Sequence, residues 1–76
     1  MKISNVKRWL NKNNIDFKVW AMMDGSTAIC AELPSITTEE YSTIKSKLIK
    51  YIKRYNGLYE FRAGYSCILI KDLIIE

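Results

Sequence analysis

The side chains of this chain that could do acid–base or metal chemistry are eight carboxylates and two cysteines, and histidine is absent. Without histidine, the Ser-His-Asp triad, the Cys-His dyad, the H-E-x-x-H zinc site and the Cys₂His₂ finger are excluded within one chain. Two cysteines also cannot complete a Cys₄ zinc site unless subunits share it. The commonest catalytic and metal-binding centres are therefore ruled out.

The carboxylates show no spacing typical of a catalytic pair or a metal cage. Four of them are expected at outward positions of strands, where charge is typical of a solvated surface: Asp16, Glu32, Glu60 and Asp72. The three glycines are isolated from one another, so no loop is available to cradle a phosphate. Cys30 and Cys67 fall in apolar segments and are interpreted as small core or sheet-face residues. We therefore expect a non-enzyme that uses no cofactor, metal or small-molecule substrate.

The cationic residues are the next candidates, because many of them fall in a predicted second helix. Lys47, Lys50 and Arg54 form one stripe on the helical wheel, beside an apolar stripe. Such a stripe could follow a phosphate backbone, where affinity comes from counterion release. The candidate nucleic-acid site comprises Lys47, Lys50, Lys53 and Arg54. The same residues also fit a solvated helix end that complements the helix dipole, and no recurring DNA or RNA motif is present. Nucleic-acid binding is therefore the alternative function.

Two helices are expected to carry most of the positive charge. The first is predicted to begin at a Ser4 cap and to run to about Asn14, with Lys7, Arg8 and Lys12 away from its apolar side. The second is predicted to begin at a capping box and to end at Asn56-Gly57, where Gly57 takes the left-handed conformation. The predicted capping box pairs Thr37 with Glu40.

Four strands complete the predicted fold. Residues 15–23 alternate with a period of two, and Asp24-Gly25 then predicts a type I′ hairpin turn. The other strands are expected over 27–33, 58–62 and 65–71. The order αββαββ predicts an α+β fold in which two helices pack on one face of a four-stranded, mainly antiparallel sheet. We expect residues 1–76 to form a single domain.

The two halves show a faint internal similarity. Lys7-Arg8-Trp9 resembles Lys53-Arg54-Tyr55, and Phe17-Lys18 resembles Phe61-Arg62. The halves are interpreted either as two αββ pseudo-repeats or as two units that look alike because any two αββ units do.

The sheet face turned away from the helices is expected to be apolar at its centre. Its predicted apolar residues are Trp20, Met22, Ala28, Cys30, Ile68 and Ile70, while Leu69 is expected to face the helices. A surrounding rim that includes Lys18 and Arg62 gives this face the composition of a protein interface. A helix or the tail 73–75 could instead cover it, and the apolar run 67–70 leaves the register of its strand open.

The sequence favours a small, non-catalytic protein-interaction module. Its candidate interface is Trp20, Met22, Lys18, Arg62, Ile68 and Ile70, and the partner is either a second copy, giving a homodimer, or a foreign protein. Abundant residues with AT-rich codons favour a phage or mobile-element accessory protein that modulates a host factor. The first ten residues lack the apolar run of a signal peptide, and the two cysteines are expected to be reduced thiols, so we expect a cytoplasmic protein with no membrane partner.

Overall fold

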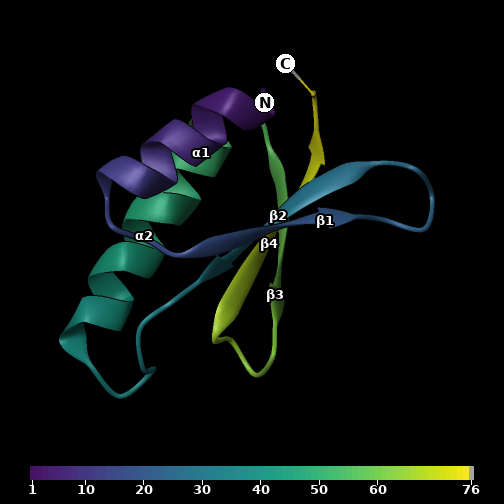
Figure 1. The fold of residues 1–76 in the computed structure, drawn as a ribbon. Helices are drawn as coiled ribbons and strands as arrows, with labels where there is room; N and C mark the ends of the chain where they lie inside the picture. Colours follow the sequence, from purple (N-terminus) through teal and green to yellow (C-terminus); the bar gives the residue numbers. More distant parts are fainter. Residues whose placement is uncertain (76) are drawn as a thin grey trace.

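The computed structural model describes residues 1–75, and its elements follow the predicted order αββαββ. The helices are α1 (Ile3–Lys12) and α2 (Glu39–Arg54). The strands are β1 (Phe17–Ala21), β2 (Thr27–Glu32), β3 (Leu58–Arg62) and β4 (Cys67–Leu73). Both helices lie on the same side of the sheet (Figure 1). The predicted α+β fold is confirmed.

The sheet is antiparallel throughout and has the order β1-β2-β4-β3. Each αββ segment supplies one hairpin, and the inner strands β2 and β4 join the two hairpins. The pairing places Ile29 opposite Ile70 and Ala31 opposite Ile68. All four side chains are buried in the core beneath the helices.

The main core lies between the helices and one face of the sheet. Each helix buries residues four apart, Val6 and Leu10 on α1, and Leu48 and Ile52 on α2. This spacing places two side chains on one side of a helix, so each helix presents an apolar stripe to the sheet. Within residues 1–75, neither helix is long and apolar enough to cross a membrane.

The fourth strand faces the opposite way from the prediction. Ile68 and Ile70 are fully buried under the helices, whereas Leu69 and Cys67 lie on the other face of the sheet. Because side chains alternate along a strand, a shift of one residue in the alternation moves every side chain to the other face. The run 67–70 is apolar in both phases, so the pattern alone could not decide between them. The placement of Ile68 and Ile70 at the candidate interface was therefore wrong.

A bulge near the end of β4 directs the C-terminal segment toward α1. The pairing shifts between Thr27 and Ile29, and Asp72 has a left-handed φ of 53°. Leu73 then enters the main core. The Ile3 N–H donates to the carbonyl of Ile74 at 2.8 Å. Since this carbonyl satisfies a helix-end N–H, α1 begins at Ile3 without the predicted Ser4 cap. The tail does not cover the sheet face that is turned away from the helices, which we call the second face.

The ends of α2 differ by one residue from the prediction. Thr38, not Thr37, is the N-cap, and its Oγ1 accepts a hydrogen bond from the Tyr41 N–H at 3.2 Å. At the other end Asn56, rather than Gly57, takes the left-handed conformation, with a φ of 55°. Gly57 is needed for a different reason: a Cβ there would collide with the side chains of Met1 and Ile52.

The β1–β2 hairpin closes through a longer turn than the predicted type I′. Met22 donates its N–H to the carbonyl of Ser26 at 2.9 Å, which leaves three residues in the loop. Only Gly25 among these has a positive φ. Asp24 Oδ1 accepts hydrogen bonds from both the N–H and the hydroxyl of Ser26, which stabilise the loop. The hairpin extends well beyond the helices (Figure 1).

Candidate functional site

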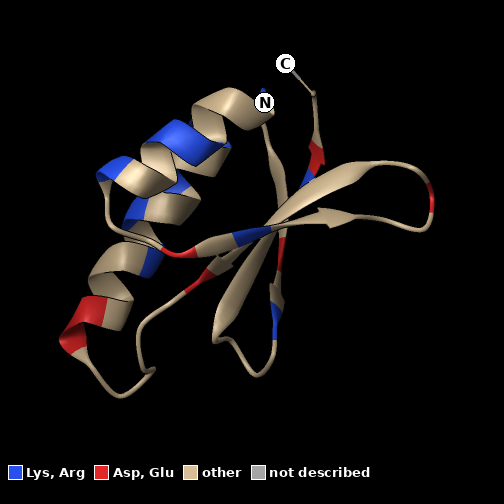
Figure 2. Ribbon diagram, viewed as in Figure 1, with Lys and Arg blue, Asp and Glu red and all other residues tan. Residues whose placement is uncertain are grey.

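Positive and negative charges are segregated along this chain. Segments 1–14 and 45–57 contain nine of the twelve cationic side chains and none of the eight acidic ones. The nine are Lys2, Lys7, Arg8, Lys12, Lys45, Lys47, Lys50, Lys53 and Arg54. The rest of the chain therefore carries a net charge of −5 within the total of +4. The two segments form α1 and most of α2, so the helix layer is strongly cationic (Figure 2).

The two cationic helices lie side by side and antiparallel. Near the middle of the pair, the rings of Trp9 and Tyr51 stack with their centroids 4.6 Å apart and their planes within 8°. Toward the end of α1, Lys47 Nζ donates to Asn13 Oδ1 at 3.1 Å. Asn13 Nδ2 in turn donates to the carbonyl of Trp9 at 2.8 Å. These contacts hold Lys47 and the aromatic stack in one arrangement.

Two adjoining depressions cross the outer surface of this helix pair and share Tyr51 as a wall. The first has a volume of about 320 Å³ and is lined by Met1, Lys2, Asn5, Arg8, Tyr51 and Tyr55. The second has a volume of about 220 Å³ and is lined by Trp9, Lys47, Lys50, Tyr51 and Arg54. We call the two depressions together the basic groove. Among residues 1–75, its lining has five cationic side chains, three aromatic rings and no carboxylate.

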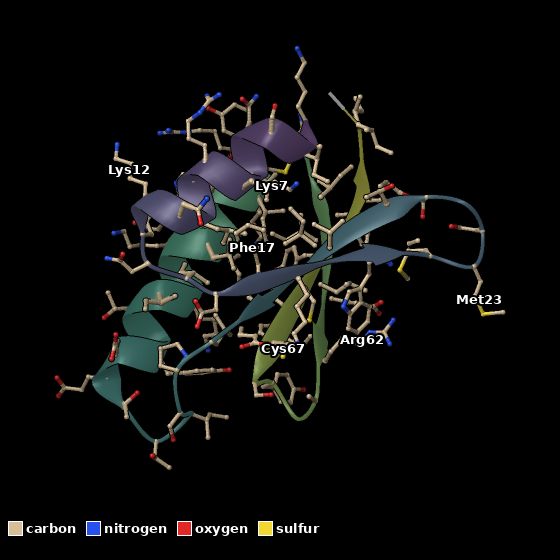
Figure 3. All side chains as sticks on the ribbon, viewed as in Figure 1. Lys7, Lys12, Phe17, Met23, Arg62 and Cys67 are labelled. Carbon is tan, nitrogen blue, oxygen red and sulfur yellow. The ribbon has the colours of Figure 1, made fainter. Side chains whose placement is uncertain are left out.

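Five of the nine cations of the helix layer have no polar partner among residues 1–75. The following side chains make no ion pair or hydrogen bond within residues 1–75: Lys7, Lys12, Lys50, Lys53 and Arg54. Figure 3 shows Lys12 extending from α1 away from the sheet. Burial raises the pKa of the Tyr51 hydroxyl above its ordinary value of 10, and nearby Tyr55 raises it further. The Tyr51 hydroxyl is therefore neutral near pH 7, so the groove offers positive charge and neutral rings.

Three of the four cations in the candidate nucleic-acid site line the basic groove. Lys47, Lys50 and Arg54 line one depression, whereas Lys53 does not border the groove. Each helical residue advances by about 100°, so Lys53 points to a different side of α2 than Arg54.

The sequence predicted a second basic helix with Lys7, Arg8 and Lys12, but the candidate site did not include Arg8 or Trp9. Arg8 and Trp9 meet Arg54 and Tyr55 in the groove. The signal was present in the similarity between Lys7-Arg8-Trp9 and Lys53-Arg54-Tyr55, because both helices supply an arginine and the adjacent aromatic residue to the groove.

At the centre of the second face, neighbouring side chains bury one another. Ala28, Cys30 and Leu69 form a small buried cluster, with Met22 and Cys67 packed against it. Trp20, opposite Ala28 in the neighbouring strand, keeps 37% of its surface exposed. The large apolar patch predicted for this face is therefore reduced to Trp20 and its surroundings.

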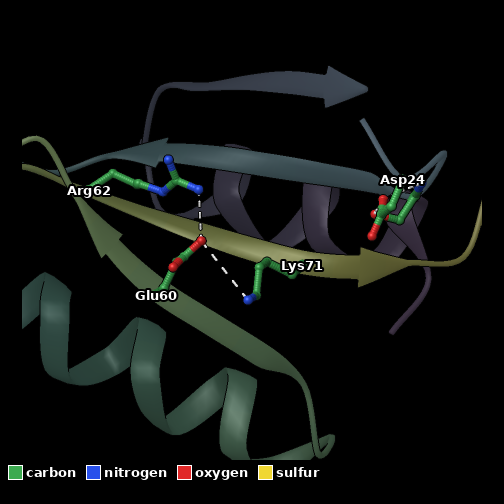
Figure 4. A network of polar contacts seen from close by, with 5 residues as sticks. Asp24, Glu60, Arg62 and Lys71 are labelled. Atoms are coloured by element: carbon green, nitrogen blue, oxygen red, sulfur yellow. Dashed lines mark hydrogen bonds and ion pairs between the residues drawn. The ribbon is translucent and has the colours of Figure 1, made fainter. Parts of the chain in front are cut away.

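The charges on the second face are paired with one another. Glu60 Oε1 lies 2.8 Å from Arg62 Nη2 and 4.0 Å from Lys71 Nζ (Figure 4). The hydrogen bond from Arg62 is the main reason that the pKa of Glu60 is lowered. Lys18 Nζ lies 4.0 Å from Glu32 Oε1. Lys18 and Arg62 thus form ion pairs within the chain, whereas Lys7, Lys12, Lys50, Lys53 and Arg54 form none among residues 1–75.

The two cysteines are free thiols beneath this face. Burial, followed by the effect of nearby Cys67, raises the pKa of Cys30 to about 11. A thiol with this pKa is protonated at neutral pH and is a poor nucleophile. Within residues 1–75, no group of three histidine, cysteine or acidic side chains could hold a metal ion.

No protein-family profile, curated protein sequence or solved structure matches this chain in the three comparisons that we made. The geometry and charge of its two surfaces therefore carry the functional argument.

Proposed function

We propose that this protein binds nucleic acid through the basic groove of its helix layer. The observation that carries this proposal is charge segregation: nine of twelve cations lie in two segments that contain no acidic residue. Cations such as Lys50 and Arg54, which form no ion pair or hydrogen bond among residues 1–75, gain free energy by neutralising phosphates, because condensed counterions are released. Lys47, Lys50 and Arg54 line one depression and form the core of the proposed phosphate-binding row.

The aromatic residues favour a single strand as the ligand. Tyr55 lines the groove beside Arg8, and 55% of its surface is exposed. Proteins that bind single strands combine a cationic groove with exposed rings on which bases stack. Trp9 and Tyr51 stack face to face, whereas Tyr55 meets Tyr51 only in a T-shaped contact, so Tyr55 is the ring assigned to a base.

Two triple variants with equal net charge test the proposal. In Lys47→Gln/Lys50→Gln/Arg54→Gln the groove loses three cations, and in Lys18→Gln/Arg62→Gln/Lys71→Gln the second face loses three. Both change the net charge from +4 to +1. Binding of labelled single-stranded and duplex oligonucleotides is measured by fluorescence anisotropy over a range of salt concentrations.

The groove variant should bind much more weakly. The slope of log affinity against log salt should become shallower by about 2.1 for a single strand, or by about 2.7 for duplex. The second-face variant should keep the wild-type slope. Equal losses in the two variants would show that only net charge matters, and absence of binding at low salt would refute the proposal.

Tyr55→Leu tests the stacking step separately. We expect it to weaken single-strand binding by about 1–3 kcal/mol while leaving the salt slope unchanged. Tyr65→Leu is the matched control, since Tyr65 is similarly exposed but lies in the β3–β4 turn. If both variants bind as the wild type does, base stacking on Tyr55 is wrong.

The protein-binding function expected from the sequence has less support than the groove. Ile68 and Ile70 lie in the main core, and the centre of the second face is covered. Of the residues proposed for that interface, Trp20 is the apolar side chain that stays exposed, at 37%.

A further inference from the structure

Strand β1 is the open edge of the sheet. The order β1-β2-β4-β3 leaves β1 and β3 at the two edges. The central residues of β3 are half-buried, whereas β1 is exposed from Lys18 to Ala21. Natural proteins protect exposed edges with proline, bulges or charged residues. β1 has no proline and only one charged residue, Lys18.

The backbone of β1 has hydrogen-bonding groups directed away from the sheet. Glu32 donates its N–H to the carbonyl of Asp16 at 2.8 Å, and Met22 donates to Ser26 at 2.9 Å. Because hydrogen-bonded and non-hydrogen-bonded pairs alternate in an antiparallel ladder, the even-numbered residues between them also face β2. Phe17, Val19 and Ala21 therefore direct their N–H and C=O groups outward, where the sheet has no further strand.

Apolar side chains flank these groups on both faces of the sheet. Val19 is on the helix side but is 47% exposed, because the hairpin extends past the helices. Trp20 is on the opposite face and is also exposed. Figure 3 shows Met23 projecting from the tip of the same hairpin. The edge thus combines unpaired backbone groups with exposed apolar surface.

We propose that β1 pairs antiparallel with β1 of a second copy of this chain, about a twofold axis at Val19. Val19 then lies opposite Val19 of the second copy, and Phe17 lies opposite its Ala21. All three outward-facing residues find backbone partners in this register. Lys18 lies opposite Trp20 of the second copy, and the symmetry repeats this pair.

Charge complementarity favours this occupant and this register. In the pairing about Val19, each Lys18 ammonium can lie against an indole ring, which is a favourable cation–π contact. Asp16 falls opposite Met22 of the second copy, so no like charges face each other. A twofold axis at Lys18 would place the two ammonium groups directly opposite, which is destabilising.

The pairing would join the two sheets into one of eight strands. Directly opposed residues in an antiparallel pair project to the same face, so both helix layers would lie on the same side. The proposal rests on β1 alone and does not depend on nucleic-acid binding.

Sedimentation of the full chain at increasing concentration tests the oligomeric state. The wild type should form a dimer, and Val19→Pro should be monomeric because proline removes the central outward-facing N–H. Val19→Thr is the control, since it keeps the N–H and the branched shape, and it should still dimerise. Thermal unfolding of each variant shows whether it is folded.

Amide hydrogen exchange of the wild type tests the same pairing without a mutation. The amides of Phe17, Val19 and Ala21 should become protected as the concentration rises, and filtered nuclear Overhauser spectra should connect Lys18 Hα of one copy with Trp20 Hα of the other. A wild type that stays monomeric would overturn the proposal. A dimer in which these three amides stay unprotected would also overturn it, because it would have to form through another surface.

Discussion

The helix layer and the second face of the sheet both contain cations beside aromatic or apolar residues, but they differ in what those cations contact. On the second face, Arg62 and Lys71 meet Glu60, and Lys18 meets Glu32. On the helices, Lys50 and Arg54 line a groove that has no carboxylate among the described residues 1–75. The second face pairs its cations with its own carboxylates, whereas Lys50 and Arg54 have no ion pair among residues 1–75.

The largest expected effects test whether the second face is truly closed. Leu69→Ala should lower the free energy of unfolding by about 2–5 kcal/mol, as Ile70→Ala should, because both side chains are fully buried on opposite faces of β4. Urea denaturation measures both values, with Val19→Ala as an exposed control on the same sheet. If Leu69→Ala lowers the free energy of unfolding no more than Val19→Ala does, Leu69 is not buried on the second face.

The buried thiol of the second face should respond to alkaline pH. Cys30 has a pKa of about 11 in the folded protein, against an ordinary value of 9.0. The folded state then holds the proton more tightly than the unfolded state, so stability should fall as pH rises from about 9 toward 11. Urea denaturation of the wild type across this range, compared with Cys30→Ser, measures the effect.

The same pKa makes Cys30 slow to react. In the wild type at pH 8, alkylation of Cys30, followed by mass spectrometry of its peptide, should be about 100-fold slower than that of a free thiol, because far less thiolate is present. Cys30→Ser, which keeps Cys67, is the matched variant. Alkylation of Cys30 at the rate of an unfolded thiol would contradict the burial described for this face.

A smaller effect concerns the start of the helix that carries most of the groove. Thr38→Ala should lower stability by about 1 kcal/mol, because it removes the side-chain acceptor for the Tyr41 N–H. Thr37→Ala is the adjacent control and should have a much smaller effect, since Thr37 does not cap α2. Thermal unfolding distinguishes the two caps, and a larger loss in Thr37→Ala would restore the cap predicted from the sequence.

The smallest expected effects have opposite signs on the two surfaces. Lys50→Gln should stabilise the protein by up to about 0.5 kcal/mol at low salt, because it relieves repulsion among unpaired cations. Glu60→Gln should destabilise it, because it weakens the contacts with Arg62 and Lys71. Melting temperatures at low and high salt measure both effects. Effects of the same sign would remove the electrostatic contrast between the surfaces.

Low pH should reduce the stability that Glu60 contributes on the second face. The pKa of Glu60 is lowered from its ordinary value of 4.5, chiefly by the hydrogen bond from Arg62. Its contribution to stability is therefore complete above pH 4.5 and is lost as pH falls through the lowered value. The difference in stability between the wild type and Glu60→Gln should shrink across that range.

Local patterns predicted much of the fold and part of the site. The helical periodicity predicted the stripe of Lys47, Lys50 and Arg54, and the cations lie where that wheel places them. Errors arose where two neighbouring local solutions were nearly equivalent. Thr37 and Thr38 both precede α2 as possible caps, and the apolar run of β4 fits the core in either phase.

The sequence by itself determined the order of the elements, the absence of histidine and the segregation of charge, because these depend on residue types and on short periodicities. Only the tertiary structure decided which face of β4 is buried, that α1 lies beside α2 to form the basic groove, and that the second face closes over Leu69. These outcomes depend on contacts between residues far apart in the chain. Strand β4 is apolar on both sides, so its buried side is decided by its pairing with β2, in which Ile29 faces the core opposite Ile70.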